Sequence, residues 1–438
     1  MRSAEETFAA VLRCIHGLSR TREDVHAARG EYTLPACRNE TCWRRVWRTG
    51  IAQIAVAMNA ALEAQLVRLA TALVDVSGEQ SRVAVVPSDD RRGFWFGGGG
   101  LARDPTSGRL VLVGRYRDGG DSRTGTAAGT RGKQLVLFAL DEERMTFERV
   151  VAWDKRALDM DGRGRVLSIE GADVMFLADG QVRLLVSTER EQPYPEAVAE
   201  YQKKGTGVWQ LDVIESESLA ELDAAVMRGK PAPRPLLRST VADRLHVKDP
   251  FFLGPGLPGG MNVGFCSHPF CWTTAASCCV GLDLAASRVI EAPRFDVLPR
   301  GRCWDVASVR WTSRLRVPRI GAFASLPPMS LYFYDGCECV REHEQSDRGV
   351  ERPRGHSCEE LGGLAYGVDA DFPAVTSLTP LFPLFVSPLG TGSTRYVHAM
   401  ADEPSGDLMA VWQQSNANRA QPLMFRRLPA DQVAALLA

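Results

Sequence analysis

Hydrophobic and polar positions alternate in two different ways along the chain. Residues 51–76 form an apolar segment interrupted by single polar residues, at the spacing of an amphipathic helix. From Val83 onward, short runs of Val, Leu, Phe and Tyr alternate with clusters of Gly, Pro, Asp and Ser. Such runs between turn residues predict an all-β sandwich, barrel or propeller. The pattern therefore predicts a helical N-terminal segment over 1–82, a β domain over 83–428 and a short C-terminal helix over 429–438.

A loose five-fold repeat lies within the β domain. A charged residue precedes a strand-like run, a turn follows, and a second run comes after the turn. Each interval between the charged residues holds about four strands with their connections, which is the content of one propeller blade. A β-sandwich could mimic two or three members of this repeat, but not easily all five. We therefore expect an all-β, five-bladed β-propeller, and the leading residues of its blades are Asp104, Asp173, Asp249, Asp305 and Arg395.

Two carboxylates stand where the clearest hairpin begins. The segment LSIEGADVMFLADGQVRLLVSTE, residues 167–189, places Asp179 and Gly180 between two apolar runs, which is a strong hairpin signal. Glu170 and Asp173 precede this turn among apolar neighbours, where burying an unpaired charge is costly. The innermost strand of every blade lines the central channel of a propeller. We therefore expect carboxylates from different blades to converge at the channel mouth.

Three short motifs resemble the blade-leading acidic motifs of five-bladed β-propeller glycosidases. They are ARDP at 102–105, EGAD at 170–173 and KDP at 248–250. This clan includes arabinan- and xylan-cleaving, fructan-cleaving and mannoside-phosphorolysing enzymes. EGAD, followed by an Asp-Gly turn, is similar to the segment that carries the general-acid Glu of arabinan and fructan hydrolases. The resemblance covers roughly residues 90–425 in organisation, and only the three motifs in residue detail.

The resemblance implies a glycosidase whose paired carboxylates act on an oligosaccharide or glycoconjugate. Glycosidic cleavage needs one protonated carboxyl and one ionised carboxylate. Glu170 is the expected proton donor, because desolvation at a strand start would raise its pKa. Asp104 is the expected base or nucleophile, and Asp249 is expected to orient the substrate or tune Glu170. Asp-Pro and Asp-Gly are also common turn pairs, so a purely structural role for these aspartates stays open.

Basic, aromatic and polar residues near these motifs are expected to contact the sugar. Arg115 and Arg117 share one face of a strand at period two, and their guanidinium forks would suit an acidic sugar. A solvated loop with internal ion pairs is the alternative for these arginines. Aromatic faces stack on sugar rings, so Trp95 is a further candidate contact. The expected substrate-binding residues are Arg115, Arg117, Asp173, His268, Trp304, Asp305, Arg395 and Gln414.

Two other functions stay open at the level of sequence. The segment LDEERMTFERV, residues 140–150, resembles a degenerate Asp-box turn of six-bladed sialidases, and a six-bladed propeller is the alternative fold. A sialidase-like hydrolase of acidic sugars would need three arginines and a Tyr–Glu pair in one pocket. A non-catalytic propeller that binds carbohydrate or protein is the other alternative, because propellers host many functions. Such a binding protein would not need Glu170 and Asp104 within one sugar's reach.

Composition narrows the range of partners and cofactors. The chain has 438 residues with a formal net charge of −1, so no global field attracts it to nucleic acid or to a membrane. Its start is acidic where a signal peptide needs basic residues, so a cytoplasmic location is expected. The eleven Cys and seven His do not follow the spacing of metal sites. Phosphate-loop and hydrolase-elbow motifs are missing as well, so we expect neither a metal nor a cofactor.

Overall fold

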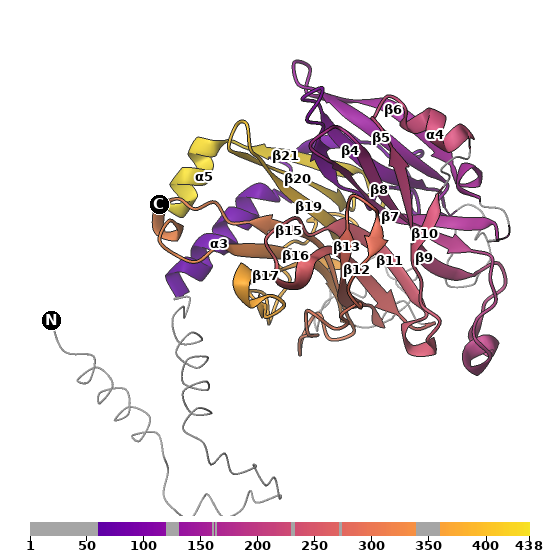
Figure 1. The fold of residues 1–438 in the computed structure, drawn as a ribbon. Helices are drawn as coiled ribbons and strands as arrows, with labels where there is room; N and C mark the ends of the chain where they lie inside the picture. The colour runs from indigo at the N-terminus through magenta and orange to yellow at the C-terminus, as the bar shows by residue number, and fades with distance from the viewer. Residues whose placement is uncertain are drawn as a thin grey trace, which may run out of the picture. The chain divides into compact units, whose positions relative to one another are not determined.

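The computed structural model describes residues 60–119, 131–159, 162, 164–228, 233–270, 274–338 and 360–438. The described strands form antiparallel sheets (Figure 1). The expected N-terminal helical segment lies outside the described residues up to position 59, and its last part forms helix α3, Ala60–Leu73. Among the described residues, no helix has the length and apolar character needed to cross a membrane.

The described strands form five sheets in succession along the chain. The first sheet has the order β2-β4-β5-β6, with β3 also on β4: β2 (Trp95–Gly97), β3 (Leu101–Arg103), β4 (Leu110–Arg117), β5 (Gln134–Asp141) and β6 (Thr146–Asp154). The second is β7 (Val166–Phe176), β8 (Val182–Arg190), β9 (Val208–Ser216) and β10 (Arg234–Leu237). The third is β11 (His246–Phe252), β12 (Met261–His268), β13 (Ala276–Asp283) and β14 (Arg288–Val289).

The last two sheets complete the ring. The fourth is β15 (Ser308–Arg316), β16 (Met329–Cys337), β17 (Leu361–Val368) and β18 (Thr376–Ser377). The fifth is β19 (Thr394–Asp402), β20 (Asp407–Gln414), β21 (Leu423–Leu428) and, from the other end of the chain, β1 (Arg82–Val85). Because β1 pairs with β21, strands from both ends of the β domain close the ring within one sheet.

The arrangement is a five-bladed β-propeller, as the sequence predicts. One strand of each sheet contacts its counterpart in the next: β3 lies against β7, β7 against β11, β11 against β15, β15 against β19, and β19 against β3. These strands therefore form the inner ring around the channel. Since there are five sheets, the six-bladed alternative is wrong.

Apolar residues fill the spaces between neighbouring blades. Val113 and Leu137 of the first blade pack with Ile169 and Val174 of the second, and all are buried. Four further clusters of this kind follow around the ring. Burial of each such side chain is worth about 1.5–3 kcal/mol, so the interblade layers supply most of the stabilisation of the ring.

Two helices cover the seam between the fourth and fifth blades. Helix α3 buries Leu66, Leu69 and Leu73, which follow the spacing of an amphipathic helix. The C-terminal helix α5, Ala430–Leu437, lies beside it (Figure 1). The two are joined where the Gln65 side-chain amide donates to the backbone oxygen of the last residue at 2.7 Å.

Glycines allow the inner strands to approach one another. A Cβ at Gly100 would lie 2.0 Å from Asp173 Oδ1, and one at Gly171 would lie 2.8 Å from the Cα of Asp249. Neither contact is sterically allowed. The Gly of EGAD is therefore needed so that the third blade can place Asp249 beside the second.

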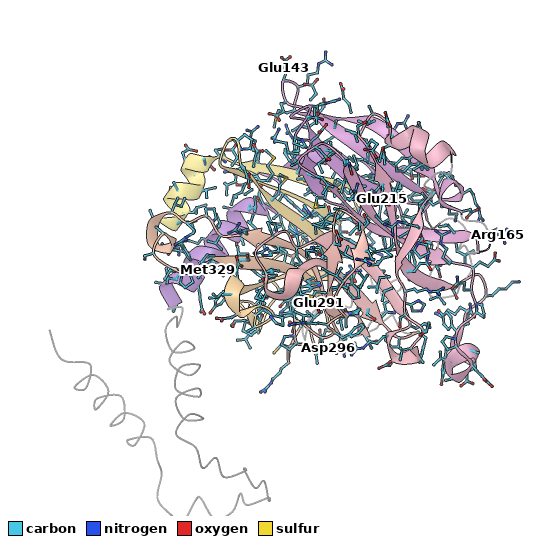
Figure 2. All side chains as sticks on the ribbon, viewed as in Figure 1. Glu143, Arg165, Glu215, Glu291, Asp296 and Met329 are labelled. Atoms are coloured by element: carbon cyan, nitrogen blue, oxygen red, sulfur yellow. The ribbon has the colours of Figure 1, made fainter. Side chains whose placement is uncertain are left out.

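The degenerate Asp-box segment is a propeller hairpin. Its turn joins β5 to β6, and Asp141 Oδ1 accepts the backbone N–H groups of Glu143 and Arg144 at 3.0 Å each. Glu143 points outward at the edge of the molecule (Figure 2). The segment thus forms the turn without specifying a sialidase.

Candidate functional site

Tyr396 of β19 lies at the centre of a charged group at the channel. Its hydroxyl donates to Glu170 Oε1 at 3.0 Å and accepts from Arg310 Nη1 at 3.2 Å. Its backbone φ of 53° lies in the left-handed region, as does that of Asp249 at 55°. Non-glycine residues rarely adopt this region, and each such residue costs of the order of 1–3 kcal/mol. Such strain is concentrated at functional sites, so its presence on two inner strands marks this group.

Glu170 lies on β7 at an interruption of the ladder between Ile169 and Ala172. Arg115 Nη2, which is fully buried, donates to Glu170 Oε1 at 2.7 Å. The Glu170 side chain keeps 19% of its surface exposed, so it is not fully enclosed.

Burial raises the pKa of Glu170, but Arg115, Lys248 and Arg117 outweigh burial and hold this pKa well below its ordinary value. The expectation of a raised pKa is therefore wrong, because the sequence does not reveal that three cations from other strand positions surround the carboxyl. Near neutral pH, Glu170 is a carboxylate and not a stored proton.

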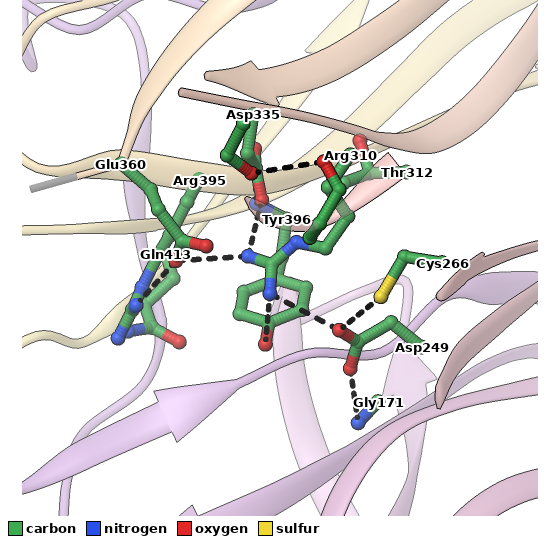
Figure 3. Close-up of polar contacts among 12 residues, drawn as sticks. Gly171, Asp249, Cys266, Arg310, Thr312, Asp335, Glu360, Arg395, Tyr396 and Gln413 are labelled. Carbon is green, nitrogen blue, oxygen red and sulfur yellow. Dashed lines mark hydrogen bonds and ion pairs between the residues drawn. The ribbon is translucent and has the colours of Figure 1, made fainter. Parts of the chain in front are cut away.

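Arg310 of β15 joins a carboxylate of β11 to two carboxylates of the fourth blade (Figure 3). Its Nη1 donates to Asp249 Oδ2 at 3.0 Å, and its Nη2 lies 2.7 Å from Asp335 Oδ2 and 2.9 Å from Glu360 Oε2. Asp249 also accepts the backbone N–H of Gly171 at 3.0 Å. Glu170 and Asp249 are thus brought together, and the contact chain between them runs through Tyr396 and Arg310.

The pKa of Asp335 is shifted in the direction opposite to that of Glu170. Burial and the neighbouring Glu360 raise its pKa to about 7, against the opposing effect of Arg310. The pKa of Glu360 is lowered instead, because Arg310 and Arg395 outweigh its burial. Asp335 is fully buried, so its proton is not presented to the channel mouth.

A small cavity lies among the inner strands below this group. Asp249, Thr312, Tyr396 and His398 contribute polar groups to its lining, together with glycines of the first and second blades. Its volume is about 20 Å³, which is room for about one water molecule. A molecule larger than water would therefore not fit into this cavity.

Asp104 is not brought to this group. It follows β3, and its carboxylate accepts from Thr106 N at 2.9 Å and from the hydroxyls of Thr106 and Ser107 at 2.7 and 2.6 Å. Its turn adjoins Leu110, five residues along β4 from Arg115, or roughly 17 Å at the rise of a strand. Asp104 is a turn former here, which corrects its expected position beside Glu170.

Three expected sugar contacts are structural instead. Trp304 is buried between blades and donates to the backbone oxygen of Thr379 at 2.7 Å. Asp305 accepts from Tyr334 Oη at 3.0 Å in the same layer. Gln414 joins β20 to the segment after α3 by donating to the backbone oxygen of residue 76 at 3.0 Å. Each is buried away from the mouth, and no local pattern in the sequence indicates which face it occupies.

The remaining expected residues lie near the channel. Arg117 and Arg395 lie over the ring of Trp95, at 3.9 and 4.1 Å from its centroid. Burial lowers the pKa of Arg117 to about 9. Asp173 accepts the backbone N–H of residue 252 at 2.7 Å and lies 3.6 Å from His398 Nε2. His268 lies at the end of β12, beside Lys248.

Several residues of the charged group around Tyr396 were not predicted from the sequence. Arg310, Asp335 and Glu360 were not expected at the site, and Lys248 was noted only as part of a motif. Asp335 follows the apolar and aromatic run LYFY within its strand, and this was the available signal for it. Arg310 lies in the mostly polar segment SVRWTSR, which gives no such signal. Within the described ranges, no cluster of three or more His, Cys, Asp or Glu side chains could hold a metal ion.

The arginines and the Tyr–Glu pair of the sialidase-like alternative do occur together. Arg115, Arg310 and Arg395 lie 5.5, 4.3 and 5.6 Å from the centroid of the Tyr396 ring. Each of these arginines, however, is already paired with a carboxylate of the protein. Burial also raises the pKa of Tyr396 well above its ordinary value, which opposes a nucleophilic phenolate. Together with the five blades, this leaves the sialidase-like alternative without support.

Comparisons with known proteins give the fold and not a family. No family model matches the chain, and no curated protein matches it either. Among solved structures, BT0996 in an RGII complex aligns with a TM-score of 0.50 and 10% identity, covering 83% of this protein and 95% of the other. At this identity the likeness speaks for the fold alone, and it agrees with the five-bladed propeller.

Two further solved structures are similar at lower scores. The α-L-arabinofuranosidase from Lactobacillus brevis has a TM-score of 0.47 and 10% identity, over 77% of this protein and 90% of the other. The β-1,2-mannobiose phosphorylase from Listeria innocua, in complex with β-1,2-mannobiose, has a TM-score of 0.46 and 12% identity, over 82% and 98%. The protein thus resembles propeller glycosidases and a phosphorylase in structure, without a family at the level of sequence.

Proposed function

We propose that the channel mouth binds an oligosaccharide or glycoconjugate and that its carboxylates cleave a glycosidic bond. One observation carries the proposal: Glu170 and Asp249 come together from neighbouring inner strands, and the Glu170 side chain keeps 19% of its surface exposed. Glycosidic cleavage uses two carboxyl groups separated by about 5–10 Å. The chain of contacts through Tyr396 and Arg310 supports a separation of this order.

The electrostatics assign the roles in this proposal. Because its cations keep Glu170 ionised, Glu170 activates water or attacks the anomeric carbon. Asp249 is then the group that protonates the leaving oxygen. It has to take up that proton against its ion pair with Arg310.

That requirement favours a second candidate, which is saccharide binding without cleavage. The inner strand β3 of the first blade follows the glycines at 97–100, and neither stretch carries a carboxylate, while Asp104 is engaged in its own turn. A site with two paired carboxylates and no exposed acid could hold a sugar through hydrogen bonds alone.

Turnover of a panel of aryl glycosides and oligosaccharides by Glu170→Gln and Asp249→Asn tests the proposal. With Glu170 as base or nucleophile, Glu170→Gln should lose about 10²–10⁴-fold on both substrate types. Asp249→Asn should lose as much on oligosaccharides and far less on activated aryl glycosides, which need little protonation. Glu143→Gln, at the outer edge, is the matched control, and each assay is run with and without inorganic phosphate to separate phosphorolysis from hydrolysis. Saccharide binding without turnover by the wild-type protein would instead establish the second candidate.

A further inference from the structure

Three polar side chains of the third blade share one face beside the carboxylate group. His246 and Lys248 are two positions apart on β11, and His268 of β12 pairs directly with His246. Residues two apart on a strand point to the same face, and directly paired residues do so too. All three residues are buried. Lys248 and His268 are diagonal neighbours in this ladder, a separation that long side chains span.

The ring of His268 presents an acceptor without a partner. Its Nδ1 lies 2.6 Å from the carbonyl oxygen of Pro269, which can only accept, so Nδ1 carries the hydrogen and Nε2 the lone pair. Burial, with help from His246 and Lys248, holds the pKa of His268 well below its ordinary value, so the ring is neutral. Nε2 is buried, and no hydrogen-bond partner reaches it in the part of the chain that the structure describes. A bound donor would remove the cost of this unpaired acceptor.

The ammonium of Lys248 donates no hydrogen bond within the described residues. It lies 4.0 Å from Asp249 Oδ2, beyond hydrogen-bonding distance, and 5.6 Å from the centroid of the Trp209 ring. It has three hydrogens to donate, and no hydrogen bond from it occurs within the described residues. Because it lowers the pKa values of both Glu170 and His268, it lies within electrostatic reach of the two.

His246 packs beside His268, and its own tautomer is fixed by a backbone hydrogen bond. Trp209 N–H donates to His246 Nδ1 at 3.2 Å, so the hydrogen of the His246 ring is on Nε2. Burial and Lys248 lower its pKa to about 3, which leaves the ring neutral. Its ring lies 4.7 Å from that of His268, centroid to centroid. Both tautomers are therefore set by backbone groups.

We propose that Lys248 and His268 together bind a hydroxyl group of a neutral sugar next to Glu170, an inference that rests on saccharide binding at the proposed site. A hydroxyl accepts from the Lys248 ammonium and donates to His268 Nε2. A carboxylate or a phosphate dianion has no hydrogen to donate, so it would leave Nε2 unpaired, and the Glu170 carboxylate would repel it. At this position the pair thus selects a hydroxyl over a carboxylate or phosphate, so a neutral glycoside meets it without placing an anion beside Glu170.

Binding of defined probes to three variants tests this inference. Methyl glycosides of neutral pentoses and hexoses, the matching uronic acid glycosides and inorganic phosphate are measured by saturation-transfer NMR and calorimetry. We expect a neutral glycoside to bind, and its affinity to fall about tenfold or more in both Lys248→Met and His268→Phe. Lys204→Met, an exposed lysine, is the control and should bind as the wild type does. The ¹⁵N shift of His268 Nε2 should also move on addition of that glycoside.

Several results would overturn the inference. The first is that no neutral glycoside binds. The second is that a uronide or phosphate binds more tightly than the neutral glycosides and does so through Lys248. The third is that neutral glycosides bind equally well to both variants, which would mean that only water reaches His268. Its failure is separable from failure of the proposed cleavage. If glycoside binding weakens in the two variants but the wild type shows no turnover, only the proposed cleavage is contradicted. If the protein turns over a glycoside and KM is unchanged in both variants, only this inference is contradicted.

Discussion

The hydroxyl of Tyr396 donates a hydrogen bond to Glu170 Oε1 at 3.0 Å, which joins the fifth blade to the second across the channel. Arg115 of the first blade donates to the same oxygen at 2.7 Å. One carboxylate oxygen is therefore fixed by donors from two other blades. This fixes the position of Glu170 before any ligand arrives.

Replacing Tyr396 by Phe should destabilise the propeller. The change removes a donor to Glu170 and an acceptor for Arg310, both charged, so a loss of about 1.5–3 kcal/mol in the free energy of unfolding is expected. Urea denaturation measures it. Tyr201→Phe, at an exposed ring, is the control, and a loss no larger than in that variant would show that the Tyr396 hydroxyl contributes little.

Arg115→Met should change how stability depends on pH. The folded-state pKa of Glu170 is depressed, so its contribution is present above the unfolded value near 4.5 and is lost as the pH falls through the folded value. Without Arg115 this acid-sensitive contribution should shrink, and stability at neutral pH should fall by about 1.5–3 kcal/mol, the range for a lost hydrogen bond to a charged group. Denaturation at several pH values measures both effects. Arg144→Met, at an exposed arginine, should leave the pH profile unchanged.

Asp335→Asn should reduce the pH dependence of stability between 3.8 and about 7. The folded-state pKa of Asp335 is raised to about 7 from 3.8, so its contribution to stability is complete below 3.8 and is lost as the pH rises toward 7. The variant has no carboxyl to titrate at this position, so it should not lose this contribution to stability between these values. Parallel curves for variant and wild type over this window would contradict the raised pKa.

Asp104→Asn should lower the stability of the protein through its turn and leave binding and turnover at the site unchanged. The carboxylate orders its turn through Thr106 and Ser107, so a loss of about 1 kcal/mol is expected. Saccharide binding and any turnover should stay within about twofold of the wild type, because the turn lies far from Glu170 along β4. A large loss of activity with a small loss of stability would restore Asp104 as a catalytic group.

The blades could be predicted because their signals are local. Turn residues and apolar runs recur along the chain, and EGAD and KDP do lie on the inner strands β7 and β11. Asp104 could not be told apart from these, since Asp-Pro-Thr-Ser-Gly after a strand is also a turn signal. Its hydrogen bonds within the turn, not its motif, decide its position.

The electrostatics of the site could not be predicted, because they arise between blades. Glu170 is ionised owing to Arg115 and Lys248, which are 55 and 78 positions away along the chain, and no local pattern records that approach. The burial of Trp304 depends in the same way on its contact with Thr379 of another segment. Local patterns predict the strands, whereas the packing of blades decides which charges meet.

The protonation state of Glu170 is the most direct test of the role proposed for it. A ¹³C NMR titration of the glutamate carboxyl carbons, with Glu170→Gln to assign the resonance, gives its pKa in the folded protein. We predict a midpoint below the ordinary value of 4.5, so that Glu170 stays ionised through neutral pH. A midpoint near or above about 6, as for a carboxyl held as a general acid, would contradict this role.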